Sequence, residues 1–324
     1  MSDFELDRPL VFQPLFMERI WGGRRLETLY GKRLPASTPI GESWEIADRP
    51  EAQSVVDRGP WRSRTLHDLW LHEREQVFGQ MPDSERFPLL IKLLDAHEKL
   101  SVQVHPPADV ATEMGGEPKS EFWYIVDAAP AAELYVGLKP GSSRATFEQA
   151  IAKGTVDQHL HRVPVKKGDA LFLPSGRVHA IGAGNVIVEI QQNSDTTYRV
   201  FDWNRYDESG APRTLHVTES LQAIDFADRA PELVTAKGET LLRDPLFHID
   251  RWILERPRDL ASRGQFAIVG CLTGALECAG EMLEPGGFFV VPASLRDRAL
   301  RPVKPDTTLL RVTLPQQGGD SAHC

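Results

Sequence analysis

The sequence has few cysteines and no long apolar run. Only three cysteines, Cys271, Cys278 and Cys324, occur among 324 residues, and none forms a Cys-x-x-Cys pair. This usage indicates neither a disulfide framework nor a cysteine-ligated metal centre. The N-terminal residues show no basic stretch followed by an apolar one, and no run of eighteen apolar residues occurs. We therefore expect no secretory leader and no membrane partner, and a cytoplasmic location.

An excess of positive charge is also missing. The chain carries 37 Lys and Arg against 46 Asp and Glu, for a formal net charge of −9. Nucleic acid and anionic membranes are therefore not expected as partners. An anionic small molecule would have to be bound by a few local Lys or Arg side chains.

Short apolar or alternating runs, separated by turn residues, fill most of the chain. The 25 Gly and 24 Pro are spread along the whole length rather than gathered in a linker. This pattern is typical of antiparallel strands in a sandwich or barrel, and it predicts a mainly β fold with a few short helices. Helices are expected over 64–79, from Thr146 to Gly154, and from Thr218.

A polar stretch after about Asp225 separates two sets of strand-like runs. A chain of this length can bury one large core or two smaller ones. We expect a larger domain over 1–230, a small all-β domain over 240–316 and a frayed tail over 317–324.

The stretch LSVQVHPP, residues 100–107, alternates between apolar and polar residues. Successive side chains of a strand point to opposite faces. One face would carry three apolar side chains and the other three polar ones: Leu100, Val102 and Val104 against Ser101, Gln103 and His105. The alternation alone fits both an exposed strand and the polar lining of a pocket.

Two further runs carry side chains that could join Gln103 and His105 around a metal ion. Glu121 begins the strand-like run EFWYIVD, and His179 ends the run GDALFLPSGRVHA. In the second run Gly176 permits a tight turn after the strand, which would aim His179 back into a barrel. Imidazole, carboxylate and carboxamide ligands from three strands suit zinc, iron or manganese.

These runs also resemble known motifs. The Gly–Pro–Gly–His spacing that ends at His179 matches the second motif of the cupin superfamily. The runs KLLDAHEKLSVQVHP, KSEFWYIVDA, PSGRVHAIGAG and QQNSDTTYRVFDW resemble the type I mannose-6-phosphate isomerases, in their short bacterial form. IWGG at Ile20 and IGESWEIAD at Ile40 agree with this family, so the resemblance spans roughly Pro14 to Asp225.

The resemblance implies two cupin-type β-barrel (jelly-roll) domains, of which the first binds metal. In the second, LEPGGFFVVPAS has the Gly-then-Pro half of a cupin motif but ends in Ser294 and Leu295 without a histidine. We therefore expect a metal-free second barrel. One departure from the family is Pro107, which stands after Pro106 where the family usually has Asp. A second proline fixes the backbone and removes an amide donor there.

By the same resemblance, Gln103, His105, Glu121 and His179 would bind one Zn²⁺ per chain. The implied activity is the interconversion of mannose 6-phosphate and fructose 6-phosphate through an enediol intermediate. The small-molecule partner would be this sugar phosphate, and we expect a monomer or a weak homodimer.

The resemblance further implies a catalytic Arg199, an active-site carboxylate at Glu189 and an active-site lysine at Lys119. Aldose–ketose isomerisation removes a proton beside a carbonyl and leaves a negative oxygen, so it needs a base and an electrophile. Arg199 offers fixed positive charge to the enediolate or to the phosphate. Glu189 is our candidate for the proton transfer, with Asp195 and a zinc-bound water as alternatives.

The phosphate requires cations in an acidic protein. Lys119 and Arg199 are the leading candidates. Ser101 and Lys92 flank the same strand run, although Lys92 could equally be a solvated edge residue.

Two other functions stay open on the sequence. Two His and one Glu also form the facial triad of iron oxygenases, and a cupin could bind a sugar phosphate without catalysis. Gln103, Lys119 and Arg199 favour the isomerase. The pair His159 and His161 is a competing metal site, but it lies in a predicted turn where side chains two apart diverge.

Overall fold

The computed structural model describes residues 6–206, 210–260 and 264–315. Within these ranges the chain forms 23 strands and five short α-helices, which confirms the mainly β prediction. The strands form four large antiparallel sheets and one small ribbon, β4 (Asp48–Arg49) with β5 (Ala52–Gln53). No helix in the described part of the chain has the length and apolar character needed to cross a membrane.

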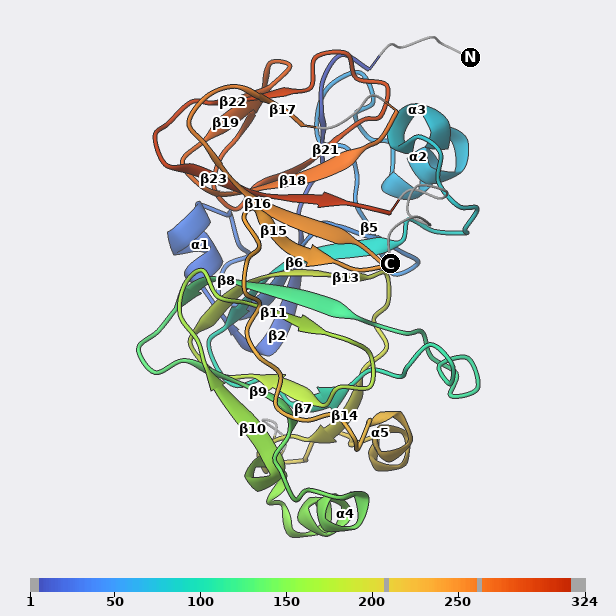
Figure 1. The fold of residues 1–324 in the computed structure, drawn as a ribbon, viewed down its shortest axis with the longest axis vertical. Coiled ribbons are helices and arrows are strands. Elements are labelled where there is room, and N and C mark those ends of the chain that lie inside the picture. The colour runs from blue at the N-terminus through green and yellow to red at the C-terminus, as the bar shows by residue number, and fades with distance from the viewer. Residues whose placement is uncertain (1–5, 207–209, 261–263, 316–324) are drawn as a thin grey trace.

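Two facing sheets make the lower half of the molecule in Figure 1. The six-stranded sheet has the order β11-β8-β13-β6-β3-β2, with β2 Leu15–Gly23, β3 Ile40–Ile46, β6 Leu89–Ala96, β8 Glu121–Ala128, β11 Ala170–Leu173 and β13 Asn185–Gln192. The five-stranded sheet has the order β10-β9-β12-β7-β14, with β7 Val102–Val104, β9 Glu133–Leu138, β10 Leu160–Pro164, β12 His179–Ile181 and β14 Tyr198–Phe201. Trp123, Ile125, Val136 and Ile187 belong to the buried cluster between the two sheets.

Two further sheets make the upper half. The six-stranded sheet has the order β1-β21-β18-β23-β16-β15, with β1 Leu10–Val11, β15 Thr240–Arg243, β16 His248–Leu254, β18 Ala267–Thr273, β21 Phe288–Val291 and β23 Thr307–Thr313. The four-stranded sheet has the order β17-β22-β19-β20, with β17 Arg258–Asp259, β19 Leu276–Cys278, β20 Glu281–Leu283 and β22 Ala299–Pro302. The N-terminal β1 joins this half because Leu10 pairs with Val290.

The two six-stranded sheets pack against each other through one shared core. Alternate residues of a strand face opposite sides of its sheet. In β8, Trp123 faces the lower interior, whereas Phe122 packs in the core that also holds Ile268 and Val312 of the upper sheet. Figure 1 therefore shows a stack of sheets rather than two separate bodies. The domain limits 1–230 and 240–316 and the closure of each pair into a barrel stay predictions, and the tail 317–324 lies outside the described residues.

The helices are short, as expected, but their limits differ in part. They are α1 Arg25–Tyr30, α2 Leu66–His72, α3 Arg74–Phe78, α4 Arg144–Lys153 and α5 Val217–Ala223. The single helix predicted over 64–79 is wrong, because Glu73, with φ −128°, ends α2 and begins α3. This break lets Trp70 and Phe78 meet in the core, with ring centroids 5.0 Å apart.

Two helix ends are set by side chains. Helix α4 begins earlier than predicted because Ser143 and Thr146 form a capping box, and it ends at Gly154 with φ +66°, as predicted. Helix α1 was not predicted. Its first N–H, at Arg25, donates to the Asp95 carboxylate of β6 at 2.7 Å, a partner that is distant in the sequence.

Replacing Phe266 by Ala tests the shared core. The Phe266 ring is fully buried and lies 5.3 Å from Phe78 and 5.9 Å from Phe87, centroid to centroid. Phe266→Ala is expected to lower the free energy of unfolding by about 3–5 kcal/mol, measured by urea denaturation. Ile253→Ala is the control because Ile253 is 60% exposed. Equal effects of the two substitutions would contradict the shared core.

Candidate active site

Strand β7 lies at the wall of a cavity of about 390 Å³. Val102 and Val104 face the outer side of the sheet, in the cluster that contains residues of α4 and α5. Gln103 lines the cavity, so of the two interpretations that the alternation left open, the structure shows the polar lining of a pocket. Leu100 differs from the prediction, because it precedes β7, where strict alternation no longer applies, and it lines the cavity together with Ser101.

Three of the predicted metal ligands meet beside this cavity. The ligand atoms of His105, Glu121 and His179 lie within 4.8 Å of one another, and all three side chains are buried. His105 Nε2 is 3.3 Å from Glu121 Oε1, and His179 Nε2 is 3.8 Å from Glu121 Oε2. No other group of three or more His, Cys, Asp or Glu with this geometry is found in the described residues. The competing His159 lies outside the group, with Nδ1 3.2 Å from Ser142 Oγ.

The turn before His179 has the predicted form. Gly176 has φ +89°, a conformation that favours glycine. Its N–H donates to the carbonyl of His105 at 2.8 Å, and His179 pairs with Gln103 across the sheet. The turn thus brings His179 of β12 next to Gln103 of β7 and to His105, which follows β7.

Each imidazole is oriented by a backbone carbonyl. His105 Nδ1 donates to Thr196 O at 2.7 Å, and His179 Nδ1 donates to Arg177 O at 2.9 Å. The lone pair of each Nε2 is therefore free to bind a cation. Within the described residues, neither Nε2 atom nor Glu121 Oε2 has a hydrogen-bond partner. Buried polar atoms rarely lack partners, so this donor set fits a bound metal ion.

The protonation states also suit a metal. Burial, and then the Lys119 charge, lowers the pKa of His105 to about 4, and burial lowers the pKa of His179. Burial acts to raise the pKa of Glu121. The Lys119 ammonium, 2.8 Å from Oε1, and the two imidazoles have the larger, opposite effect, so the pKa of Glu121 lies well below its usual range. The site thus offers two neutral imidazoles and one carboxylate, the forms that bind metal.

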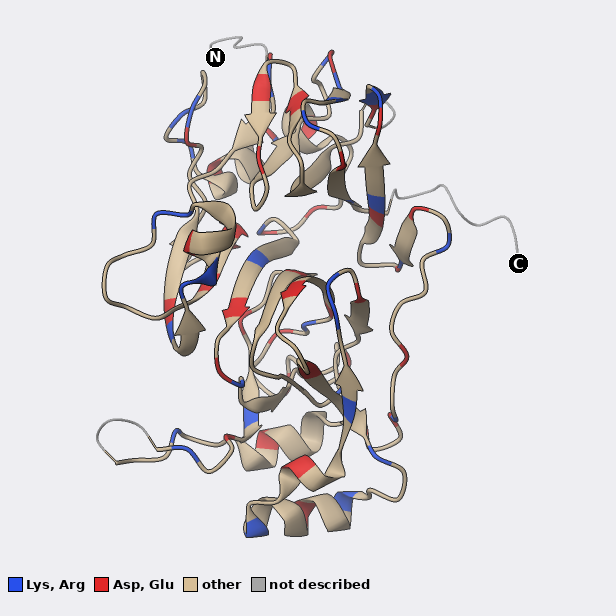
Figure 2. Ribbon diagram, turned by 90° about the vertical axis from the view of Figure 1, so that its left-hand side faces the viewer, with Lys and Arg blue, Asp and Glu red and all other residues tan. Residues whose placement is uncertain are grey.

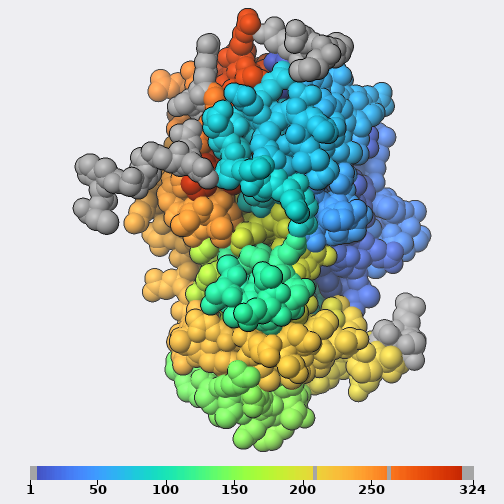
Figure 3. Space-filling model, turned by 90° about the vertical axis from the view of Figure 1, so that its right-hand side faces the viewer, coloured from blue at the N-terminus to red at the C-terminus, as the bar shows by residue number. Residues whose placement is uncertain are grey.

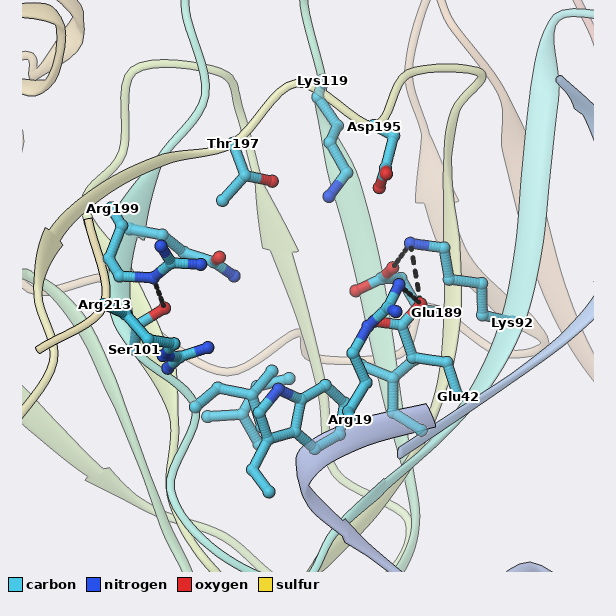
Figure 4. Close-up of a pocket in the computed structure, with 15 residues that line it drawn as sticks. Arg19, Glu42, Lys92, Ser101, Lys119, Glu189, Asp195, Thr197, Arg199 and Arg213 are labelled. Atoms are coloured by element: carbon cyan, nitrogen blue, oxygen red, sulfur yellow. Dashed lines mark hydrogen bonds and ion pairs between the residues drawn. The ribbon is translucent and has the colours of Figure 1, made fainter. Parts of the chain in front are cut away.

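The other predicted site residues all line the cavity. Figure 4 shows Ser101 and Arg199 at one end, Lys92 and Glu189 at the other, and Lys119 and Asp195 along one side. Further lining residues are Arg19, Trp21, Glu42, Leu94, Gln103, Ile181, Thr197 and Arg213. His105, Glu121 and His179 are not among the lining residues, but two lining residues contact this group: Lys119 lies 2.8 Å from Glu121, and Gln103 pairs with His179 across the sheet.

One end of the cavity holds two carboxylates around a lysine. Lys92 Nζ lies 3.2 Å from Glu189 Oε1 and 3.9 Å from Glu42 Oε2. Lys92 is only 3% exposed, so its interpretation as a solvated edge residue is wrong. Trp123 Nε1 donates to Glu189 Oε2 at 2.9 Å, which fixes the carboxylate.

The two carboxylates have opposite pKa shifts. Burial, and then the charge of Glu121, raises the pKa of Glu189. Burial also acts to raise the pKa of Glu42, but the charges of Lys92 and Arg19 outweigh it and lower this pKa to about 2. Glu42 is thus the fixed anion of the pair, whereas Glu189 accepts a proton more readily.

The other end holds a cation without an anionic partner. Arg199 Nε donates to Ser101 Oγ at 3.3 Å, and Nη1 donates to Thr214 O at 2.9 Å. The remaining cations of the lining each pair with a carboxylate: Arg19 with Glu42, Lys92 with Glu189, Lys119 with Glu121 and Arg213 with Asp202. Of the described carboxylates, none forms an ion pair with Arg199. Its positive charge is therefore available to a ligand.

Sequence reasoning missed several lining residues, among them Arg19, Glu42 and Arg213. Arg19 enters the cavity through an irregular part of β2, where Glu18 and Gly23 both pair with Ile40. A signal for two of them was present, since the family-like run IGESWEIAD includes Glu42 and IWGG adjoins Arg19. Arg213 precedes α5 and carried no comparable signal.

Basic and acidic residues are interspersed along the ribbon on the side shown in Figure 2. The charge available to a ligand is instead that of the cavity lining. It carries five cationic and three carboxylate side chains: Arg19, Lys92, Lys119, Arg199 and Arg213 with Glu42, Glu189 and Asp195.

Comparison with known proteins identifies the family. Residues 10–123 match the model of the phosphomannose isomerase type I catalytic domain. Mannose-6-phosphate isomerase ManA of Bacillus subtilis is 39% identical over 304 residues, covering 91% of this chain and 93% of that protein. The mannose-6-phosphate isomerase of Streptococcus mutans is 39% identical over 273 residues, covering 82% of this chain and 85% of that protein.

Solved structures agree. The mannose 6-phosphate isomerase from Bacillus subtilis superposes with a TM-score of 0.84 at 33% identity, covering 95% of this chain and 100% of that chain. The phosphomannose isomerase from Salmonella typhimurium, a variant structure at 16% identity, shares the fold with a TM-score of 0.76, covering 95% of this chain and 100% of that chain. The chain therefore belongs to the type I mannose-6-phosphate isomerases.

Proposed function

We propose that the chain interconverts mannose 6-phosphate and fructose 6-phosphate with one Zn²⁺ held by Gln103, His105, Glu121 and His179. The observation that carries the proposal is the buried His105–Glu121–His179 group, whose Nε2 and Oε2 atoms lack partners in the described chain. Gln103 pairs with His179 and lines the cavity, so it lies between this group and the substrate space. When bound, zinc would supply Lewis-acid polarisation of the substrate oxygens.

We assign the proton transfer to Glu189. It is 3% exposed and lines the cavity, and its raised pKa suits a group that accepts and returns a proton. Glu189 would remove the proton from the carbon beside the aldehyde and return it to the former aldehyde carbon, while the hydroxyl proton on the carbon beside the aldehyde passes to the oxygen of the former aldehyde. Lys92 and the Trp123 indole hold the two oxygens of its carboxylate during this exchange. Asp195, the alternative base, is exposed and lies in a loop.

We assign Arg199 to the negative charge that develops on the enediolate. Arg199 pairs with Gln103 across the sheet, which places it one strand from a proposed metal ligand, and it has no carboxylate partner among the described residues. A fixed cation in a cavity stabilises such charge without reorganising during the reaction. Lys119 and Ser101 would complete the polar surroundings of the sugar phosphate.

Metal removal tests the zinc assignment. Treatment with a chelator is expected to abolish formation of fructose 6-phosphate in a coupled assay, and added Zn²⁺ should restore it. Activity should be the same with and without oxygen, which an iron oxygenase would not show. Full activity in protein free of metal would contradict the proposal.

Arg199→Ala tests the electrostatic role. The variant should lose about 10²–10³ in kcat, because a positioned charge at the reacting oxygen is missing. Zinc content, measured by atomic emission, should stay at one ion per chain. Loss of zinc together with activity would show that Arg199 is structural instead.

Glu189→Gln tests the base, with Asp195→Asn as the matched control. Glu189→Gln should abolish exchange of the substrate proton with solvent deuterium, followed by NMR, whereas Asp195→Asn should retain it. The opposite pattern would transfer the assignment to Asp195.

A further inference from the structure

The loop between β7 and β8 contains His105 and leads into Glu121, two members of the proposed metal site. In Figure 3 it forms the blue-green lobe near the centre of the face, above α5. Pro106 and Pro107 stand near the start of this loop. The carbonyl of Pro107 accepts the N–H of Ala111 at 2.9 Å, so the second proline opens a compact turn.

A single carboxylate fastens the far end of this loop. Glu117 Oε2 accepts from Arg49 Nη1 at 2.6 Å, and its Oε1 accepts from Arg86 Nη2. Arg49 belongs to β4, and Arg86 lies in the segment before β6. Two parts of the chain that are distant in sequence therefore contact Glu117. The pairs are only partly exposed, with 12% for the Arg49 side chain and 34% for that of Glu117.

The backbone of Glu117 is bound to the segment 194–196. Its N–H donates to Thr196 Oγ1 at 3.0 Å, and its carbonyl accepts from Ser194 Oγ at 3.2 Å. Arg49 reaches the residue just before this segment, because its Nη1 also donates to Asn193 O at 3.0 Å. The contact between the two loops is close: a Cβ on Gly116 would lie 2.7 Å from Thr196 Cγ2.

This segment orients a metal ligand and forms part of the cavity wall. Thr196 O is the acceptor of His105 Nδ1 at 2.7 Å, and the flanking Asp195 and Thr197 line the cavity. The carbonyl that sets the tautomer of His105 is therefore held in place by Glu117. None of Glu117, Arg49 and Arg86 lines the cavity itself.

We propose that Glu117, clamped by Arg49 and Arg86, is a positioning residue that orients His105 through Thr196. The proposal rests on the proposed metal site. Glu117 does not contact the substrate in this proposal. Its carboxylate holds the loop through Arg49 and Arg86, its N–H binds the Thr196 hydroxyl, and the Thr196 carbonyl orients the His105 imidazole. Groups that hydrogen-bond to metal ligands typically contribute 10–100-fold in metal affinity.

Two substitutions break this chain of contacts at different points. Glu117→Ala removes the clamp, and Thr196→Val removes the hydroxyl that accepts the Glu117 N–H while keeping the methyl group and the carbonyl. Each should raise the Kd for Zn²⁺ by more than twofold and up to about 10-fold, because the Thr196 carbonyl remains but is less well positioned, measured by competition with a chromogenic chelator. Because both act through the same link, their effects in the double variant should be less than additive.

The control is Glu148→Ala, which removes an exposed ion pair between Glu148 and Arg144. Both residues lie on α4, which contains none of the proposed metal ligands. It should leave the zinc Kd and the KM unchanged. Thermal unfolding of the metal-free proteins separates a loss of fold from a loss of orientation.

The outcomes decide the proposal independently of the enzyme assay. Weaker zinc binding in both variants, with metal-free stability close to that of the parent, supports it even if the parent lacks isomerase activity. Zinc Kd values within twofold of the parent would overturn it. A zinc effect that only matches a general loss of stability would also overturn it, since Glu117 would then be a structural residue.

Discussion

The buried carboxylate of Glu121 is the constraint on which the site depends. It lies between two imidazoles and the Lys119 ammonium, at 1% exposure, with Oε2 lacking a protein partner in the described chain. Burying an ionised group is costly, and the Lys119 ammonium offsets part of this cost, so a further cation beside Oε2 would stabilise the arrangement. The paired sheets, the Gly176 turn and the backbone acceptors of both histidines all serve to hold this one group.

The cavity divides the chemistry between its two ends. At one end the ammonium of Lys92 lies between Glu42 and Glu189, so most of the charge is balanced within the protein. At the other, Arg199 is bound only by a hydroxyl and a carbonyl of the described residues. A substrate anion therefore finds uncompensated positive charge at one end and a proton acceptor at the other, with the metal-binding group beside the middle. This separation suits an isomerase, which must move a proton while a neighbouring oxygen carries the charge.

Much of this could be predicted from the sequence, because the strands impose a period of two and the family motifs are local. His105, Glu121 and His179 were placed by these signals, and so was the turn at Gly176. Leu100 was not, since alternation holds only within the three residues of β7. Arg19 depends on an irregular pairing of β2 with β3, and α1 depends on Asp95 from another strand. The break at Glu73 reflects packing of two aromatic rings in a core formed by distant segments. Such contacts between distant segments leave no periodic pattern in the sequence.

X-ray absorption spectroscopy at the zinc edge of the zinc-loaded protein would test the proposed ligand set independently of activity, since it reports the atoms bound to the metal. We expect two imidazole ligands with oxygen ligands and no sulfur, and a spectrum with one imidazole fewer for His179→Ala. An unchanged spectrum in that variant, or a sulfur ligand from Cys271 or Cys278, would contradict the proposed ligand set.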